Sequence, residues 1–515
     1  MKLVFLHTSD IHGYLLSSTY QNKTDYDAGF GLDRVSSVVK AKRAEYGANH
    51  VIVTDAGDCL QGSPLAAYVH ASNQASALKQ YAAAYNALDY DARCLGNHDF
   101  NYGLGYLKDY LTATNTPILN SNILPMQQDI SHMGQPYQII EKQGIKIGLL
   151  GITTQYVPHW EPADHVAGLK FVSAYEQVKS YAKLLRPQVD VLAVIYHGGF
   201  EDDPVSGKQQ EPHTGENEGY QILTKIPEVD VLLTGHQHQQ LALTVNNTAI
   251  VQPGYRGEAV AEVIIEIDDT TKTIKHMKTE LISTENFKPD PVIVALSSKL
   301  DAATQDWLDQ PIAQLDQAAP IGDVNQARLH GAPFINLLQQ MQLSFTEADI
   351  SATAVMSETA PGFGKQVTMR DILLNYPFSN QLCKIAVTGS QLRQIVEYSL
   401  SFLVKDERGK VDFAPKWRHA LFNFDVFYPL KYQADIARPI GNRLTEFSLN
   451  KKPIVDKQIY YLAVNNYRVM GGGFYPVYSM DKIVEVLDKD YVQMFQEFLT
   501  KQQVKVDYQT NYRFY

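Results

Sequence analysis

Cysteine is scarce in this sequence of 515 residues, with only Cys59, Cys94 and Cys383. An odd and widely spaced set of three does not form the disulfide framework of a small secreted domain. No apolar run approaches the ~20 residues that a membrane-spanning helix needs. The apolar stretch after Lys2 has four residues, which is shorter than the core of a secretory signal peptide. We therefore expect a cytoplasmic chain, although a secreted form that had lost its leader would look the same.

An excess of positive charge is also missing, because the formal net charge is −11. This balance argues against a stable nucleic-acid partner and against binding to a membrane surface. A small anionic substrate stays possible, since bound metal ions can reverse the field locally. The chain is 45% hydrophobic and 20% charged, as globular proteins are, and its length predicts two or three domains. The sequence does not define an oligomeric state.

Several short apolar runs in the first half of the chain end at polar residues and glycines. They predict buried strands, and helical periodicity between them predicts helices at 32–46 and 74–88. In an α/β sheet, sites form beyond the carboxyl ends of the strands, so these polar residues are the candidates for a site. Alternating residues in 249–283 predict further strands that close the first domain. The predicted site-bearing strands are 3–6, 50–55, 92–95, 190–196 and 230–234.

A boundary between domains is predicted after residue 286. Residues 291–308 have the periodicity of a helix, and a looser stretch rich in Ala, Pro and Gly follows. We expect a first domain at 1–286, a connector at 287–322 and a second domain at 323–515. The second domain contains no metal-binding motif.

Seven side chains in the first half could bind metal. Their mixture of imidazole, carboxylate and amide oxygen suits Mn, Zn, Fe, Co or Ni. A single zinc site needs three or four ligands, so this set is large enough for two metals that share a carboxylate. The chemistry alone leaves both Asp58 and Asp55 open as the shared carboxylate, whereas Cys59 and Cys94 are interpreted as small buried residues. The candidates are Asp10, His12, Asp58, Asn97, His197, His236 and His238.

The order of the motifs that carry these ligands resembles that of the calcineurin-like metallophosphoesterases. The whole chain resembles the 5′-nucleotidase family, whose members have such a metallophosphoesterase domain at the N-terminus. This resemblance implies an α/β (α+β) fold, with a four-layer β-sandwich flanked by helices and a C-terminal α/β domain that selects the nucleotide. The motifs are Asp10-Ile11-His12, Gly57-Asp58, Gly96-Asn97-His98-Asp99, His197 and Gly235-His236-Gln237-His238.

The resemblance also implies two divalent metal ions and phosphoester hydrolysis by a hydroxide that bridges them. The Gly-Asp order of the family favours Asp58 over Asp55 as the carboxylate shared by both metals. The first metal would be held by Asp10, His12, Asp58 and His238. The second would be held by Asp58, Asn97, His197 and His236.

A catalytic role is implied for His98, which follows the ligand Asn97. In the family this histidine points at the phosphoryl group and pairs with an aspartate. Here the matching position is Asn101, which can orient the ring but cannot stabilise imidazolium as a carboxylate does. We therefore expect His98 to be less basic than its counterpart, unless the geometry lets Asp99 take over.

Substrate binding is implied for aromatic residues of the second domain. Tyr467, which precedes the run Gly471-Gly472-Gly473, matches an aromatic residue that stacks on the base. Phe422 or Phe424 would form the other side of this clamp, and the register leaves both open. A nucleotide bound by such a clamp and by the metals would use both domains.

One departure from typical 5′-nucleotidases concerns the segment 350–358. It contains no arginine where the family carries arginines that face substrate phosphate or carboxylate. Together with the motifs Asn101-Tyr102-Gly103 and Asn465-Asn466-Tyr467-Arg468, this resembles the 2′,3′-cyclic-nucleotide 2′-phosphodiesterase/3′-nucleotidase branch, which we favour. The alternatives are a 5′-nucleotidase or UDP-sugar hydrolase and, in another class, a non-catalytic protein that binds nucleotide or metal.

Overall fold

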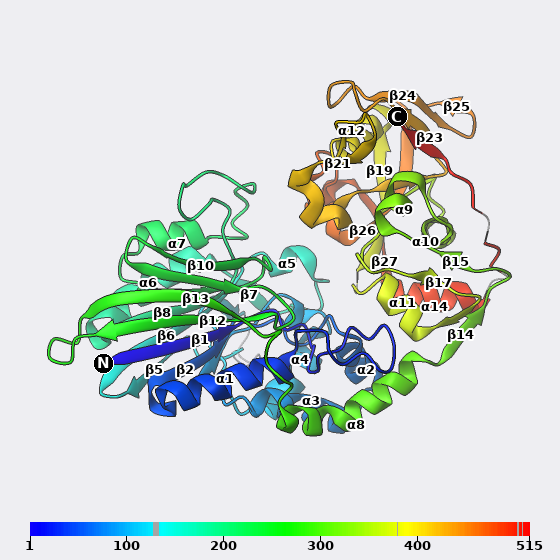
Figure 1. Ribbon diagram of the computed structural model, residues 1–515. Coiled ribbons are helices and arrows are strands. Elements are labelled where there is room, and N and C mark those ends of the chain that lie inside the picture. Colours follow the sequence, from blue (N-terminus) through cyan, green and yellow to red (C-terminus); the bar gives the residue numbers. More distant parts are fainter. Residues whose placement is uncertain (127–132, 379, 502–503, 507) are drawn as a thin grey trace. The chain divides into compact units, whose positions relative to one another are not determined.

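The structure is a computed structural model that describes residues 1–126, 133–378, 380–501, 504–506 and 508–515. Its contacts divide the chain into two units, Met1–Gln305 and Asp306–Tyr515 (Figure 1). The division falls inside helix α8 (Pro291–Leu308), whose bounds match its sequence periodicity. None of the helices in these ranges is long and apolar enough to cross a membrane.

The first sheet of unit 1 is built around β1, whose continuous apolar run is buried on both faces. β1, β2 and β3 pair in parallel, whereas β12 and β13 pair antiparallel at one edge. The strand order is β13 (Ile274–Ser283), β12 (Ala259–Ile267), β1 (Lys2–Thr8), β2 (Val51–Asp55) and β3 (Ala92–Arg93).

The second sheet of unit 1 has four parallel strands in its centre and an antiparallel strand at each edge. Its order is β10 (Gln240–Val245), β11 (Thr248–Pro253), β9 (Val231–Thr234), β8 (Val191–His197), β6 (Ile145–Thr153) and β5 (Tyr137–Lys142). A small separate sheet pairs β4 (Ile123–Pro125) with β7 (Leu169–Phe171).

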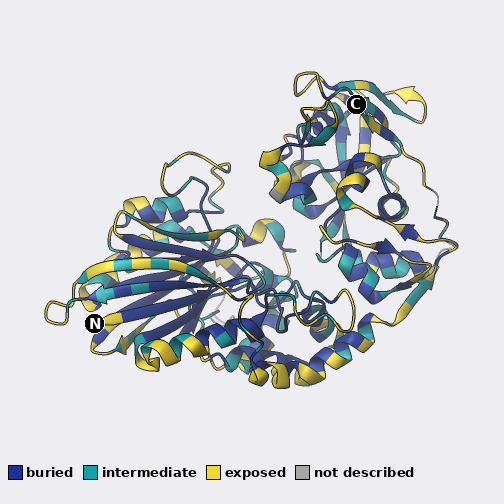
Figure 2. Ribbon diagram, in the orientation of Figure 1, coloured by how far each residue is buried: buried dark blue, intermediate teal, exposed yellow. Residues whose placement is uncertain are grey.

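The main core of unit 1 lies between its two sheets. Leu3 and Phe5 of β1 share one buried cluster with Ile147, Ala193 and Leu233 of the second sheet. The inner strands of both sheets are accordingly buried along most of their length, whereas the edge strands and the outward faces of the helices are partly exposed (Figure 2). Two sheets packed face to face in this way form a β-sandwich.

Helices cover both outer faces of the sandwich. Val178 of α6 and Ile222 of α7 share a core with Leu192 and Leu232 of the second sheet, and α1 lies along the first sheet (Figure 1). The order helix, sheet, sheet, helix confirms the four-layer sandwich expected from the sequence. The helices of unit 1 before α8 are α1 (Leu32–Tyr46), α2 (Pro64–Ser72), α3 (Ala75–Asn86), α4 (Gly103–Ala113), α5 (Val157–Trp160), α6 (Ala174–Leu185) and α7 (Gly219–Lys225).

Unit 2 is a mixed α/β domain with two main sheets. The larger has the order β22 (Val426–Tyr428), β16 (Ile350–Thr353), β26 (Ile459–Asn465), β19 (Gln381–Thr388) and β27 (Ile483–Asp490). The smaller has the order β25 (Lys452–Pro453), β24 (Leu444–Leu449), β23 (Lys431–Ala434) and β28 (Tyr512–Phe514). Three short pairs join β14 (Pro311–Gln314) to β18 (Gln366–Thr368), β15 (Ala319–Pro320) to β17 (Gly362–Phe363) and β20 (Leu403–Lys405) to β21 (Val411–Phe413).

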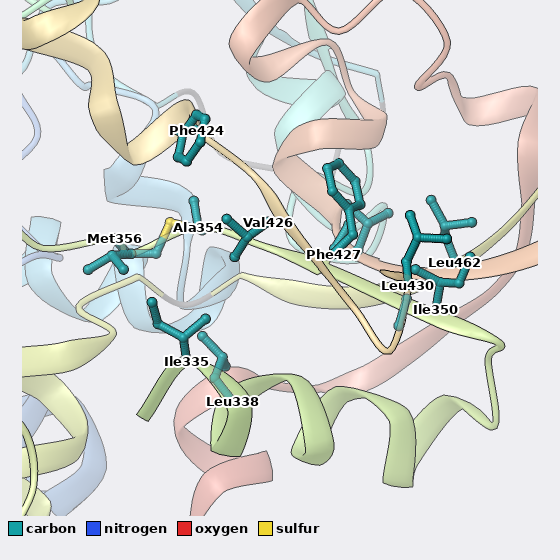
Figure 3. Close-up of a cluster of buried hydrophobic side chains, with 14 of the residues drawn as sticks. Ile335, Leu338, Ile350, Ala354, Met356, Phe424, Val426, Phe427, Leu430 and Leu462 are labelled. Atoms are coloured by element: carbon teal, nitrogen blue, oxygen red, sulfur yellow. The ribbon is translucent and has the colours of Figure 1, made fainter. Parts of the chain in front are cut away.

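Helices pack on the larger sheet of unit 2 and enclose its core. Ile335 and Leu338 of α10 lie close to Ala354 and Val426 in this cluster (Figure 3). The helices of unit 2 are α9 (Val324–His330), α10 (Pro333–Thr346), α11 (Met369–Asn375), α12 (Gly389–Leu400), α13 (Asn466–Val469) and α14 (Tyr491–Lys501).

Candidate metal centre and active site

The seven predicted ligands all lie at or just beyond the carboxyl ends of parallel strands in unit 1. Each sheet therefore presents its ligands at the carboxyl ends of its parallel strands, where sites form in α/β sheets. The first sheet supplies Asp10 and His12 after β1, Asp58 after β2 and Asn97 after β3. The second supplies His197 at the end of β8, with His236 and His238 after β9.

Five of these ligands have a left-handed backbone conformation, with φ values of 55° at Asp10, 50° at His12, 58° at Asp58, 72° at His236 and 56° at His238. A residue other than glycine in this region costs roughly 1–2 kcal/mol. Backbone bonds between the two loops hold the conformation, because Asp10 N–H donates to Gly57 O at 3.0 Å and His12 N–H donates to Asp58 O at 2.8 Å. The loops thus turn sharply and aim their side chains at one point.

Glycine is required where the loops after β2 and β3 meet. A Cβ added at Gly96 would lie 2.1 Å from the Asp58 Oδ1 atom. Only a residue without a side chain therefore lets Asp58 sit against the loop that carries Asn97.

Two groups of potential ligands form among the described residues, and Asp10 belongs to both. The first consists of Asp10, His12 and His238. In it, the His238 Nε2 atom lies 3.5 Å from Asp10 Oδ1 and 3.1 Å from His12 Nε2. The ring of His238 is half exposed and stacks on Tyr255, with 4.9 Å between the ring centroids.

The second group consists of Asp10, Asp58 and His197 and is wholly buried. His197 Nε2 lies 3.3 Å from Asp58 Oδ2 and 3.0 Å from Asn97 Oδ1, so the amide joins this group. The same Asp58 Oδ2 atom lies 3.8 Å from His12 Nε2 of the first group. Asp58 therefore lies close to both groups, although Asp10 is the carboxylate that belongs to both.

His236 lies beside the second group but belongs to neither. Its Nε2 atom is 2.9 Å from Glu216 Oε1, and its ring centroid is 5.2 Å from that of His197. Its backbone N–H donates to Asp10 Oδ2 at 3.0 Å. Glu216, which the sequence analysis did not single out, is thus the immediate partner of a predicted ligand.

Burial and neighbouring charges shift the pKa values of the ligands. Burial lowers the pKa of His12 to about 3, which leaves its imidazole neutral. Burial opposes ionisation of Asp58, but His197 and the other imidazoles outweigh it and hold the pKa of Asp58 well below its usual range. Burial also disfavours charge on His197, yet the Asp58 carboxylate raises the pKa of His197 to about 9. A cation that binds between them must displace this proton, so metal binding should release protons.

The donor set fits divalent metal ions. The Nδ1 atoms of His12 and His197 donate to the carbonyl oxygens of Gln61 at 2.9 Å and Ala56 at 2.7 Å. These bonds fix each ring so that its Nε2 atom faces the carboxylates, as in metal-binding histidines. Imidazole nitrogens, an amide oxygen and two buried carboxylates together make a set that transition metals prefer.

His98 lies next to this centre without joining either ligand group. Its ring makes an edge contact with the ring of His12, at 5.3 Å between centroids, and its backbone N–H donates to Asp58 Oδ1 at 2.7 Å. The ring Nδ1 atom lies 2.7 Å from Asn101 Oδ1. The predicted pair of His98 and Asn101 is therefore formed.

Asp99 does not substitute for the missing aspartate at position 101. Its carboxylate accepts the backbone N–H groups of Asp58, Cys59, Leu60 and Gly96, at 2.8–3.1 Å. These bonds use both oxygens of Asp99 to fasten the loops after β2 and β3 together.

Three other side chains near the motifs, those of Asp55, Cys59 and Cys94, lie outside the two ligand groups. Asp55 pairs with buried Arg93, whose Nε atom lies 3.2 Å away, and also accepts from Thr8. Cys59 and Cys94 are buried free thiols, and burial raises the pKa of both. Neither thiol belongs to a ligand group within the described part of the chain.

The predicted base clamp lies in unit 2, where buried Arg468 connects its two segments. The guanidinium donates to Phe422 O at 3.0 Å, pairs with Asp425 and lies 5.3 Å from the ring centre of Tyr467. The backbone of Phe422 and the ring of Tyr467, both half-buried residues, therefore contact the same guanidinium. Gly472 lies under the Tyr467 ring, because a Cβ there would come within 2.3 Å of it.

Phe424, the alternative to Phe422, points into the core of unit 2. It is 1% exposed and packs against Phe402, Phe413 and Phe514. A base has no access to this ring in the present conformation, so Phe422 is the better candidate.

Comparison with known proteins identifies both units. The calcineurin-like phosphoesterase model matches residues 3–240, and the model of the 5′-nucleotidase C-terminal domain matches residues 311–480. A solved Staphylococcus aureus protein, provisionally assigned as a 5′-nucleotidase and in complex with alpha-ketoglutarate, is 32% identical with a TM-score of 0.89, and the match covers 100% of both chains. A 2′,3′-cyclic-nucleotide 2′-phosphodiesterase/3′-nucleotidase from Salmonella typhimurium is 26% identical over 92% of this chain and 82% of its own. A protein of the same name from Haemophilus influenzae is 24% identical over 91% of this chain and 80% of its own.

These matches confirm the resemblance inferred from the motifs, and they agree with the donor set in requiring divalent metal ions. The chain belongs to the 5′-nucleotidase family of calcineurin-like phosphoesterases and is a hydrolase of phosphoric esters.

Proposed function

We propose that this hydrolase opens 2′,3′-cyclic nucleotides and then removes phosphate from the resulting 3′-nucleotides, with two bound metal ions. The observation that carries this proposal is the pair of ligand groups that share Asp10, with Asp58 close to both and His98 alongside. The absence of arginine in 350–358 and the activity named for the Salmonella relative support this choice of substrates.

Each metal would be held by residues of both sheets. Asp10, His12, Asp58 and His238 would bind one, and Asp58, Asn97, His197 and His236 the other. When bound, the two metals would neutralise charge on the phosphoryl oxygens and supply an activated water at neutral pH. For His236 to ligate through Nε2, its bond to Glu216 must give way. Otherwise His236 binds through its other ring nitrogen, with Glu216 as the orienting carboxylate.

His98 would contribute to chemistry through the Nε2 side of its ring, because Nδ1 is engaged by Asn101. An imidazole in this place can donate a hydrogen bond to a phosphoryl oxygen or a proton to the leaving oxygen. The hydrogen bond from the His98 backbone N–H to Asp58 Oδ1 holds His98 beside the carboxylate that we propose both metals share.

A comparison of substrates tests the proposal. The chain, stripped with EDTA and reloaded with Mn²⁺, should turn over 2′,3′-cyclic AMP and 3′-AMP faster than 5′-AMP or UDP-glucose. The stripped chain should be inactive on all four. A clear preference for 5′-AMP or UDP-glucose would refute the cyclic-nucleotide assignment, and no metal-dependent turnover of any of them would refute the proposed function.

A 5′-nucleotidase or UDP-sugar hydrolase is the second candidate. It is favoured by the likeness to the Staphylococcus aureus protein, which extends over the whole of both chains. The same substrate panel decides between the two, because both would use the same metal ligands.

Replacing Tyr467 by alanine should weaken nucleotide use. If the ring stacks on the base, its loss should cost roughly 1–3 kcal/mol of nucleotide binding, seen as a higher KM for 3′-AMP. Methyl phosphate has no ring, so its slow hydrolysis should not change. Tyr461→Ala, at an exposed tyrosine of β26, is the matched control and should leave both substrates unaffected. Equal losses for 3′-AMP and methyl phosphate would instead show that Tyr467 supports the fold.

A further inference from the structure

A buried carboxylate stands behind the pair formed by His98 and Asn101. The Asn101 Nδ2 atom donates to Glu161 Oε1 at 2.6 Å, while Asn101 Oδ1 faces His98 Nδ1 at 2.7 Å. The three side chains therefore form a continuous line of hydrogen bonds that ends at a negative charge. Nothing in the sequence connects Glu161 with His98, because the two residues are 63 positions apart.

The chemistry of the three groups fixes which way the amide points. A carboxylate can only accept, so the NH₂ of Asn101 must face Glu161. The carbonyl of Asn101 then faces His98, and a carbonyl also only accepts. The His98 Nδ1 atom must therefore carry a hydrogen and donate it, which directs its Nε2 atom away from Asn101. Without Glu161, the amide could turn over and favour the opposite tautomer.

We infer that Glu161 is a positioning residue for His98 and acts through Asn101. Glu161 supplies a carboxylate one hydrogen bond beyond the amide of Asn101. This role rests on the proposed function, in which His98 acts at the phosphoryl group.

The surroundings of Glu161 agree with a fixed, built-in role. Its side chain is 4% exposed, and its backbone N–H donates to Val157 O at 3.1 Å at the end of α5. Its second oxygen lies 3.4 Å from His165 Nδ1. The preceding residue, Trp160, lies against His236, with 5.3 Å between ring centroids. One short segment thus contacts both His98, through Asn101, and a proposed metal ligand.

An exchange of the two side chains tests the inference. Glu161→Ala and Asn101→Asp should each lower kcat for 3′-AMP by about 10- to 100-fold, the usual range for residues one contact removed from a site. In Asn101→Asp, two carboxylates face each other at the position of the present 2.6 Å bond and repel. In the double variant Asn101→Asp with Glu161→Gln, the new amide can donate to the new carboxylate, which can in turn accept from His98. We expect this exchanged pair to regain most of the lost turnover, with both metals retained in every variant.

The tautomer of His98 gives a readout that does not depend on activity. Long-range ¹H–¹⁵N spectra of histidine-labelled, zinc-loaded protein should show hydrogen on Nδ1 of His98 in the wild type and in the exchanged pair. The Glu161→Ala spectrum should show a mixture, with the His98 signals assigned from His98→Gln. Glu176→Ala removes an exposed carboxylate of α6, so it is the matched control and should change neither kcat nor the tautomer.

Two results would overturn the inference: an exchanged pair no more active than the single variants, or an unchanged His98 tautomer in Glu161→Ala. If the wild type hydrolyses none of the nucleotides, the proposed function fails, but the spectra still decide the role of Glu161. Should Glu161→Ala fail to fold, Glu161→Gln provides the same comparison, because its amide can present either end to Asn101.

Discussion

Replacing Asp58 by asparagine should remove nearly all hydrolysis and part of the bound metal. One oxygen of Asp58 lies 3.3 Å from His197 and 3.8 Å from His12, so this carboxylate reaches both ligand groups, as does Asp10, which belongs to both. An amide bridges two cations poorly and carries no charge. Because metal assistance is worth several kcal/mol and each 1.36 kcal/mol is tenfold in rate, turnover should fall by about 10³-fold or more. Elemental analysis should show fewer than two metals per chain.

Asp55→Asn is the matched control for this change. Asp55 is also buried and is only three positions away, but it pairs with Arg93 rather than with the ligands. Its substitution should lower the melting temperature while the chain keeps both metals, since a buried charge pair is weakened. If Asp58→Asn kept two metals and normal turnover, Asp58 could not be the shared carboxylate. If Asp55→Asn lost metal instead, Asp55 would take its place.

His98→Ala should retain both metals but lower kcat by about 10²–10⁴-fold, the range for an acid/base group. The ring lies outside both ligand groups, and its backbone bond to Asp58 survives in alanine. The effect should therefore appear in kcat, with metal content and melting temperature unchanged. The exposed His276 of β13 provides a control, because His276→Ala should leave kcat as it is.

Other outcomes for His98→Ala have distinct meanings. Loss of metal would make His98 a ligand or a support for the ligand loops. Normal turnover with normal metal content would exclude His98 from the chemistry, and Glu161 would then have nothing to position.

Helix bounds could be predicted wherever local sequence determines them. Helix α1 lies between Gly31 and Gly47, and α8 begins with Pro291, so glycine or proline marks these ends. The expected strand at 92–95 is shorter, since β3 ends at Arg93. Cys94 N–H still donates to Asp55 O of β2, but Gly96 N–H donates to Asp99 instead of to a strand. Such a departure depends on a partner from the following loop, which a strand pattern does not contain.

Pairing partners were beyond the reach of the sequence pattern. Alternation in 249–283 correctly indicated strands, but β11 joins the second sheet of unit 1 whereas β12 and β13 join the first. Alternation reports which side of a strand is buried and says nothing about the neighbouring strand. The chain crosses between sheets over residues 254–258, where Gly254 and Gly257 mark a turn but do not show that the next strand joins another sheet.

The candidate ligands could be predicted because each follows a strand at a fixed place in a motif. Their carboxylate and histidine partners could not. Glu216 and Glu161 lie in irregular segments, and only the folded chain brings them to His236 and Asn101. The choice between Phe422 and Phe424 depends on which of the two side chains is buried. They lie two positions apart in one short segment, and the sequence does not show which of them points into the core.

The left-handed backbone at five proposed ligands sets fold stability and metal chemistry against each other. At roughly 1–2 kcal/mol each, these conformations make up a reserve of strain comparable with the net stability of a whole domain. Random substitution at such a position by asparagine or glycine, which tolerate positive φ, would relax the backbone while removing an imidazole or a carboxylate. Selection for thermal stability alone should therefore favour substitutions in these loops that stabilise the fold and abolish activity. Stabilising this enzyme by design calls for changes elsewhere, with Asp10, His12, Asp58, His236 and His238 held constant.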